Sequence, residues 1–195
     1  MDTIKFQLNA RRQPYGQGAD LSLLNESVGN EVLAFHQKFP DYRVTPLRKL
    51  EFLSQRLGLG SIHIKDEAQR FGLNAFKGLG GSYAMGKYLA ALLERDINTL
   101  SFAELNSPVI KARIKDIVFV TATDGNHGRG VAWAAEQLGL RAVVYMPKGS
   151  SPVRAQNIRR HGAECTITEL NYDDTVRLAA KTAREQGWVL LQDTA

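Results

Sequence analysis

Lys77 lies among apolar residues and glycines rather than among other charges, in the segment RFGLNAFKGLGGS at residues 70–82. A lysine amine is a nucleophile near neutral pH only where its surroundings favour the neutral form. Apolar neighbours such as Phe71, Leu73 and Phe76, together with a helix N-terminus, act in that direction. Lys77 could therefore bind an aldehyde as a Schiff base, although a lysine at a helix start is more often an ordinary solvated residue.

A polar, glycine-rich loop with the sequence TATDGNHGRG, residues 121–130, follows an apolar run and leads into a helical pattern. Glycines let the backbone approach a ligand, and the first N–H groups of a helix have no partner within it, so the loop favours a carboxylate or phosphate. Its glycine spacing differs from G-x-G-x-x-G, which argues against dinucleotide binding. Asp124 also suits a plain helix cap, but the polar Asn126 and His127 crowded beside it favour a binding site.

Four apolar runs, separated from one another by amphipathic helical patterns, occupy the second half of the chain. This alternation is typical of parallel strands joined by crossover helices. The sequence therefore predicts an α/β fold, with an open parallel sheet flanked by helices and ligands bound beyond the carboxyl ends of the strands. The predicted strands are Ile117–Val120, Ala142–Met146, Cys165–Thr168 and Trp188–Leu191.

The helices between these strands carry capping residues. Gly139, Gly162 and Gly187 each follow a helical pattern and can adopt the left-handed conformation of a C-cap. Ser151, which precedes a proline, and Asn171, which precedes two acidic residues of a first helical turn, are predicted N-caps. The boundaries of the crossover helices follow from these five positions.

The first half of the chain has a different pattern. Leucines recur at helical spacing over residues 47–57, after Thr45-Pro46, which predicts a helix ended by the glycine at position 58. A strand is predicted at Ile62–Lys65, a long helix from about Phe76 to Leu93, and a polar linker at about Asp96–Asn106. Residues 1–42 are predicted to be irregular or helical, without a clear period.

The composition is that of a globular protein of 195 residues with a net charge of +5. The basic residues are too dispersed to predict nucleic-acid binding. A single cysteine, Cys165, excludes an internal disulfide and a cysteine-based zinc site, and it fits a reducing compartment. The N-terminus has no signal-peptide pattern, and no segment approaches the roughly 18 apolar residues of a membrane span. We expect a cytoplasmic protein with no metal and no nucleic-acid or membrane partner.

Four sequence features occur together in the order and spacing of one known enzyme family. They are Thr45-Pro46-Leu47, Lys65-Asp66-Glu67, Phe76-Lys77 and the GNHG sequence at residues 125–128. From about residue 45 to residue 195 the chain resembles the pyridoxal-phosphate enzymes of fold type II, the tryptophan synthase β family. The segments NAFK and LGGSYA around the lysine, and an aspartate at position 124 where many members have serine or alanine, resemble the diaminopropionate ammonia-lyases within it.

The resemblance implies a cofactor, a substrate class and roles for individual residues. Lys77 would bind pyridoxal 5′-phosphate covalently, and Asn126 would hydrogen-bond the 3′ oxygen of the cofactor. The loop containing Asp124, Gly125, Asn126 and His127 would bind the carboxylate of a small amino-acid substrate. Lys77 and Asp124 would be the bases for the L and D isomers of 2,3-diaminopropionate, whose α,β-elimination gives pyruvate and ammonia.

Two further implications concern the end of the chain. Asp193, at the carboxyl end of the last predicted strand, resembles a third family position that faces the site, although a strand-end turn is an equally good use of an aspartate there. Members of the family are roughly twice as long, so the resemblance implies an amino-terminal half. Residues 1–84 would be the start of the large domain with the Schiff-base lysine, and residues 85–195 a nearly complete small domain.

Such a half would lack the glycine-rich loop that holds the cofactor phosphate in this family, so we expect weak cofactor binding and little or no activity. The intact enzyme is expected to be a homodimer. A threonine or serine dehydratase of the same fold is an alternative, but it has no evident need for a carboxylate at position 124. A non-catalytic small-molecule-binding fragment is a second alternative, which would expose an apolar face. A nucleic-acid module is supported by the net charge alone.

Overall fold

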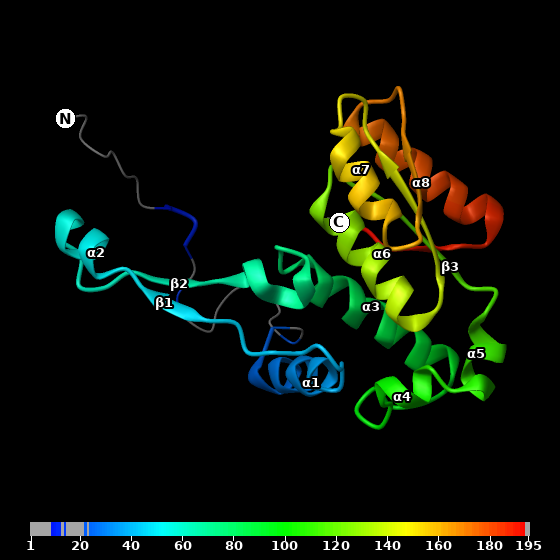
Figure 1. Cartoon of the computed structure of the whole chain (residues 1–195), viewed down its shortest axis with the longest axis horizontal. Helices are drawn as coiled ribbons and strands as arrows, with labels where there is room; N and C mark the ends of the chain where they lie inside the picture. Colours follow the sequence, from blue (N-terminus) through cyan, green and yellow to red (C-terminus); the bar gives the residue numbers. More distant parts are fainter. Residues whose placement is uncertain (1–8, 13, 15–21, 23, 194–195) are drawn as a thin grey trace.

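The computed structural model describes residues 9–12, 14, 22 and 24–193. Figure 1 shows a body in which helices enclose a sheet, and an arm of two strands and a short helix that projects from this body. Residues 1–8, on which the prediction of no signal peptide depends, lie outside the described residues. Within the described part of the chain, no helix is both long enough and apolar enough to span a membrane.

Four parallel strands form the sheet of the body, as predicted. They lie side by side in the order β5-β4-β3-β6. The chain therefore adds β4 and then β5 on one side of β3, and the connection after β5 crosses back to place β6 on the other side of β3. Ligands of open α/β sheets bind at such a reversal, here between the carboxyl ends of β3 and β6. The strands are β3 (Val118–Ala122), β4 (Arg141–Met146), β5 (Glu164–Ile167) and β6 (Val189–Leu190).

Helices cover both faces of the sheet. α6 (Asn126–Leu138) and α7 (Pro152–Arg159) pack on one face, and α8 (Tyr172–Gln186) packs on the other (Figure 1). Every residue of β3 is buried as a result. This explains why its sequence is a continuous apolar run instead of an alternation of apolar and polar residues.

Most of the predicted caps are confirmed. Gly139 and Gly187, with φ of 64° and 67°, end α6 and α8 in the left-handed conformation. The side chain of Asn171 caps the start of α8. α7 ends earlier than predicted, because Gly162 lies in the turn after the helix and is not its cap. Ser151 does precede α7, but its side chain makes no capping hydrogen bond.

A long helix, α3 (Lys77–Leu92), crosses α6 where both helices have glycine. A Cβ atom at Gly130 of α6 would lie 2.8 Å from the carbonyl carbon and oxygen of Lys77 and 2.9 Å from the nitrogen of Gly78. A Cβ atom at Gly81 of α3 would lie 3.5 Å from the backbone of Gly130. The two backbones can approach this closely only because position 130 has no side chain. The crossing therefore fixes the first turn of α3 against α6.

Polar contacts of His36 and Glu31 join α1 (Glu26–Gln37) to α3. A ring nitrogen of the buried His36 lies 3.0 Å from the carbonyl oxygen of Leu79. Tyr83 donates a hydrogen bond to the Glu31 carboxylate, and burial together with this contact raises the pKa of Tyr83 to about 12. The pKa of His36 is lowered, mainly because its burial penalises the charged ring.

The arm contradicts the prediction of one helix over residues 47–57. Leu47–Lys49 form strand β1, which pairs antiparallel with β2 (His63–Lys65), and helix α2 is confined to Glu51–Leu57. The leucine spacing was a poor guide because these leucines form no buried face; the one at position 47 is 65% exposed. The strand predicted at Ile62–Lys65 is confirmed, and Gly58 ends α2 in the left-handed conformation as expected.

Residues of the Thr45-Pro46-Leu47 and Lys65-Asp66-Glu67 motifs connect the arm to the body. Thr45 donates a hydrogen bond to Glu67, at the start of the 3-10 helix η1 (Glu67–Gly72). Arg70 Nε lies 2.8 Å from a carboxylate oxygen of Glu67, and its Nη1 donates to the Arg43 carbonyl oxygen at 2.8 Å. Removing one partner of a buried ion pair leaves an uncompensated charge. These motif residues therefore stabilise the base of the arm.

The predicted polar linker at residues 96–106 is more ordered than expected. It contains α4 (Phe102–Leu105), whose N-terminus is closed by a capping box between Ser101 and Glu104. A serine followed three residues later by a glutamate is the sequence signature of such a box. α5 (Pro108–Ile114) then leads to β3. The buried apolar residues of the segment are Ile97, Leu100 and Leu105.

The substitution Gly130→Ala is expected to destabilise the chain by about 1–3 kcal/mol, because the added methyl group would overlap backbone atoms that cannot rotate away. Gly80→Ala is the matched control in α3, since no heavy atom lies within 4 Å of a Cβ at that position. Urea unfolding followed by circular dichroism measures both variants. Equal stabilities would contradict a close crossing at Gly130.

The free energy of unfolding is expected to fall when the pH is lowered from about 7.5 to about 5.5. The pKa of His36 in the folded chain lies below its ordinary value, so the unfolded chain binds more protons in this range and gains stability as the pH falls. The variant His36→Gln should show a shallower dependence, the remainder arising from His127, whose pKa is also lowered. Denaturant titrations at several pH values would reveal an unchanged slope if this assignment were wrong.

Candidate active site

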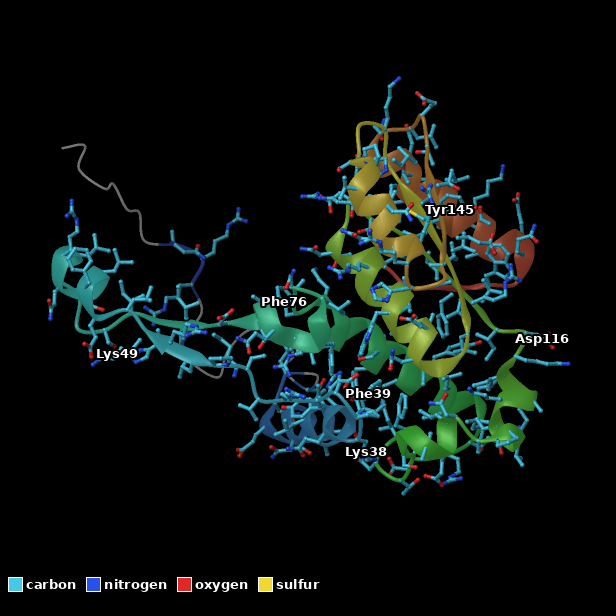
Figure 2. The ribbon with its side chains drawn as sticks, in the orientation of Figure 1. Lys38, Phe39, Lys49, Phe76, Asp116 and Tyr145 are labelled. Atoms are coloured by element: carbon cyan, nitrogen blue, oxygen red, sulfur yellow. The ribbon has the colours of Figure 1, made fainter. Side chains whose placement is uncertain are left out.

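One cleft of the body brings together three residues that the sequence singled out. Lys77, His127 and Asp193 line a cleft of about 260 Å³, formed by the first turns of α3 and α6 and by the segment after β6. Figure 2 shows Phe76, another lining residue, at the N-terminal end of α3 between the arm and the body. The cleft lies beyond the carboxyl ends of β3 and β6, where a ligand of this sheet is expected.

The Lys77 amine lies beside a carboxylate. Lys77 is the first residue of α3, its side chain is 33% exposed, and Nζ donates a hydrogen bond to Asp193. Nζ also lies 5.5 Å from the centre of the Phe76 ring. The predicted enclosure by Phe71 and Leu73 is not observed, because these side chains pack instead against a tryptophan and a glycine. The chemistry of this amine therefore depends on its carboxylate partner rather than on an apolar pocket.

Thr123 fixes the glycine-rich loop that follows β3. Its hydroxyl oxygen accepts hydrogen bonds from the backbone nitrogens of Gly125, at 3.0 Å, and Gly128, at 3.2 Å. A Cβ atom at Gly128 would lie 2.3 Å from the methyl carbon of Thr123, so no other residue fits there. The loop holds its shape through its own contacts, which suits it to the anion binding predicted for a helix N-terminus.

Three predicted site residues, Asp124, Gly125 and Asn126, lie outside the lining of the cleft. Asp124 and Asn126 are exposed at the start of α6, and Gly125 between them is buried. Arg154 of α7 donates through Nη1 to the carbonyl oxygen of Asp124 at 3.1 Å. The three residues precede His127 in the chain, at the start of α6. The structure therefore groups Lys77, His127 and Asp193 in the cleft and does not place Asp124, Gly125 and Asn126 among its lining.

His127 is buried at the inner end of its loop. Its side chain is 8% exposed, and Nδ1 lies 3.7 Å from a carboxylate oxygen of Asp193. Nε2 lies 3.1 Å from the Thr121 hydroxyl and 3.2 Å from the Leu191 carbonyl oxygen. Burial lowers the pKa of His127, and the Leu191 carbonyl and the Asp193 carboxylate only partly oppose this effect. The imidazole is therefore mainly uncharged near neutral pH.

The sequence reasoning missed the wall of the cleft that α3 provides. Gly80, Gly81 and Ala84 follow Lys77 at the spacing of one helix face, and all of them line the cleft. Gly80 is not needed for close helix packing, because a Cβ atom there would have no heavy atom within 4 Å. A helical projection starting at Lys77 would have found this face. The other lining residues that were missed are Leu191 and Gln192.

The residues present fit the aldehyde end of pyridoxal phosphate. A primary amine binds an aldehyde after losing a proton, and the Asp193 carboxylate lies beside Lys77 to exchange that proton. The small residues Gly80, Gly81 and Ala84 leave space along α3 for a flat ring. Among the described residues that line the cleft, Lys77 is the only cation. A bound phosphate group would therefore need further donors.

The comparisons with known proteins give one consistent result. A model of the family of pyridoxal-phosphate dependent enzymes matches residues 38–195. The diaminopropionate ammonia-lyase of Salmonella typhimurium is 76% identical over 194 residues, which cover 100% of this chain and 48% of that enzyme. The diaminopropionate ammonia-lyase of Escherichia coli K12 is 46% identical over 195 residues, with the same coverage of 100% and 48%. The chain thus spans about half the length of the curated relatives it matches.

A solved structure shows the same fold. The crystal structure of the Escherichia coli diaminopropionate ammonia lyase in complex with D-serine matches with a TM-score of 0.84 and 50% identity, over 89% of this chain and 44% of that one. The family model covers most of the chain, and with its parallel sheet and lysine-bearing cleft the chain belongs to the pyridoxal-phosphate-dependent enzymes, of fold type II.

Proposed function

We propose that this chain provides the catalytic lysine of a pyridoxal-phosphate-dependent carbon–nitrogen lyase, a diaminopropionate ammonia-lyase. The observation that carries the proposal is the pairing of Lys77 with Asp193 in a cleft at the carboxyl ends of β3 and β6. Family membership supports the cofactor. The 76% identity with the Salmonella enzyme supports the substrate.

Several groups of this chain would hold the cofactor and the substrate. Pyridoxal phosphate supplies, when bound, an electron sink that stabilises negative charge on the α carbon of an amino acid. Lys77 would hold it through the amine, beside the space left by Gly80 and Ala84, and Asn126 would donate to the 3′ oxygen. Backbone N–H groups of the loop from Asp124 to His127, other than that of Gly125, which donates to Thr123, would bind the substrate carboxylate. These contacts would turn the Cα–H bond of the substrate toward a base.

Two bases would explain the use of both isomers of 2,3-diaminopropionate. Opposite stereocentres present the Cα proton to opposite faces, so one base cannot serve both isomers. Lys77 would take the proton of the L isomer at Nζ, where Asp193 stabilises the resulting ammonium. Asp124, an exposed residue of the loop that leads to His127, would take the proton of the D isomer at its carboxylate. Loss of the β-amino group and hydrolysis would then yield pyruvate and ammonia.

A threonine or serine dehydratase is the second candidate, because the same lysine, loop and cleft would serve it. Its substrates carry a β-hydroxyl group in place of the β-amino group, and the carboxylate of Asp124 has no evident use in that reaction. The presence of an exposed carboxylate at position 124, three residues before the cleft residue His127, therefore favours the ammonia-lyase. A non-catalytic binding fragment would use the anion-binding loop but would have no need for a reactive amine at Lys77.

The described residues of this chain offer few groups that could bind the cofactor phosphate. Lys77 is the only cation among the described lining residues, and phosphate binding relies on several charge-assisted donors. We expect the remaining donors in the half of the curated relatives that this chain does not match, so the chain alone should bind weakly and turn over little. The proposal includes a cytoplasmic homodimer and a division into large and small domains near residue 84, within α3.

Reductive labelling tests the role of Lys77. The chain is mixed with pyridoxal phosphate, treated with borohydride and mapped by mass spectrometry after proteolysis. Modification should concentrate on Lys77, because the cleft places a carboxylate and space for the ring beside its amine. Lys87→Arg, a change on the same helix, should leave the label in place, and Lys77→Arg should abolish it. Label spread evenly over surface lysines would refute the assignment.

The substitution Asp124→Asn tests the second base, in a protein with the full length of the curated relatives. Activity on the D isomer should fall by about 100-fold or more, because a positioned base contributes at least that much. Activity on the L isomer should persist. Asp173→Asn, at an exposed position in the first turn of α8, controls for the loss of charge and should affect neither isomer. Equal losses on both isomers would remove Asp124 from this role.

A further inference from the structure

His127 presents a nitrogen without a proton to the cleft. Nε2 lies 3.2 Å from the Leu191 carbonyl oxygen, which can only accept a hydrogen bond, so the single proton of the neutral ring must be on Nε2. The Thr121 hydroxyl, 3.1 Å from Nε2, can accept from the same N–H group while it donates to the Ala122 carbonyl oxygen. Nδ1 therefore carries the lone pair, and it lies 3.7 Å from Asp193 Oδ1.

Asp193 lies between two basic nitrogens. Its Oδ1 accepts a hydrogen bond from Lys77 Nζ and faces His127 Nδ1. Two positive charges around one carboxylate oxygen would repel each other, so the protonation of one nitrogen opposes that of the other. Lys77 donates the hydrogen bond to this carboxylate, whereas the buried His127 ring, with Nδ1 3.7 Å from it, is mainly uncharged. An amine that reacts with an aldehyde must first give up that charge.

We propose that His127 replaces Lys77 as the cationic partner of Asp193 when the Lys77 amine gives up its charge. The N–H bond at Nζ breaks and an O–H bond forms at Asp193; that O–H bond then breaks and an N–H bond forms at His127 Nδ1. The three side chains have zero net charge before and after the exchange. After the exchange the Lys77 amine is neutral and the Asp193 carboxylate is still paired with a cation. An unpaired carboxylate in the cleft would carry a large desolvation free energy. His127 acts in this way as a positioning residue.

The groups that face His127 within the described residues come from three elements. The first turn of α3 contributes Lys77, the segment after β6 contributes Asp193, and β3 contributes the uncharged Thr121 hydroxyl. Burial has the largest effect and lowers the pKa of His127, Asp193 raises it, and the charge of Lys77 lowers it further. When Lys77 is neutral, the remaining charge acting on His127 is the carboxylate, and proton uptake at Nδ1 becomes more favourable.

The tautomer of His127 is the first test. Nitrogen NMR of the ¹⁵N-labelled 195-residue chain distinguishes a protonated from an unprotonated ring nitrogen, and the His127 signals are identified by their loss in His127→Gln. The neutral ring should carry its proton on Nε2. A neutral ring with the proton on Nδ1 would overturn the proposal. The measurement is made on the wild-type chain, and His127→Gln serves only to identify the signals.

A cycle of variants tests the exchange itself. Lys77→Met removes the charge and keeps an apolar stem, and the pKa of His127 should rise by about one unit. Asp193→Asn should lower the pKa of His127 more strongly in the Lys77→Met background than in the wild-type chain, since Asp193 then has no other cation. Equal effects in the two backgrounds, or no rise in Lys77→Met, would overturn the proposal.

Lys87→Met is the matched control for this cycle. It removes another lysine of α3, one that lies 3.5 Å from a carboxylate oxygen of Glu31, and it should leave the titration of His127 unchanged. The inference uses the role proposed for Lys77, but its test needs neither cofactor nor substrate. A chain whose Lys77 fails to bind pyridoxal phosphate could still show the coupled titration, so the two proposals can fail separately.

Discussion

The approach of α3 to α6 at Gly130 is the contact on which the candidate site depends. Lys77 begins α3 and His127 lies in the first turn of α6, so the separation of the two helix starts sets the separation of their side chains. A Cβ atom at Gly130 would lie 2.8 Å from the Lys77 carbonyl group, and any side chain there would force the turns apart. Contacts between backbones leave little freedom for adjustment, since protein interiors are closely packed.

The sheet supplies the third member of the cluster. β6 pairs with β3 in parallel, with Val189 opposite Phe119, so the residues that follow β6 arrive beside the start of α6. Asp193 reaches the Lys77 amine for this reason, although 116 positions separate the two residues in the sequence. The helix crossing thus positions the amine, and the strand order positions the carboxylate. Neither arrangement alone would produce the cleft.

The parts of the fold that local sequence determines were predictable, and those that depend on distant partners were not. The strands of the body are buried on both faces, so their apolar runs stand out, and Gly139 and Gly187 mark helix ends by their own conformation. The helix expected over residues 47–57 failed because β1 pairs with β2, a contact that leucine spacing cannot show. The resemblance drew attention to Lys77 and Asp193 separately, but their pairing became visible only in the folded chain.

The role of the crossing in presenting Lys77 is tested most directly by the rate at which pyridoxal phosphate and borohydride label Lys77 in the variant Gly130→Ala, resolved from the other lysines by mass spectrometry. The methyl group should displace the first turn of α3 from α6 and Asp193, and the preference for Lys77 over a surface lysine such as Lys87 should be lost. A folded Gly130→Ala chain that labels Lys77 as selectively as the wild-type chain would contradict this account.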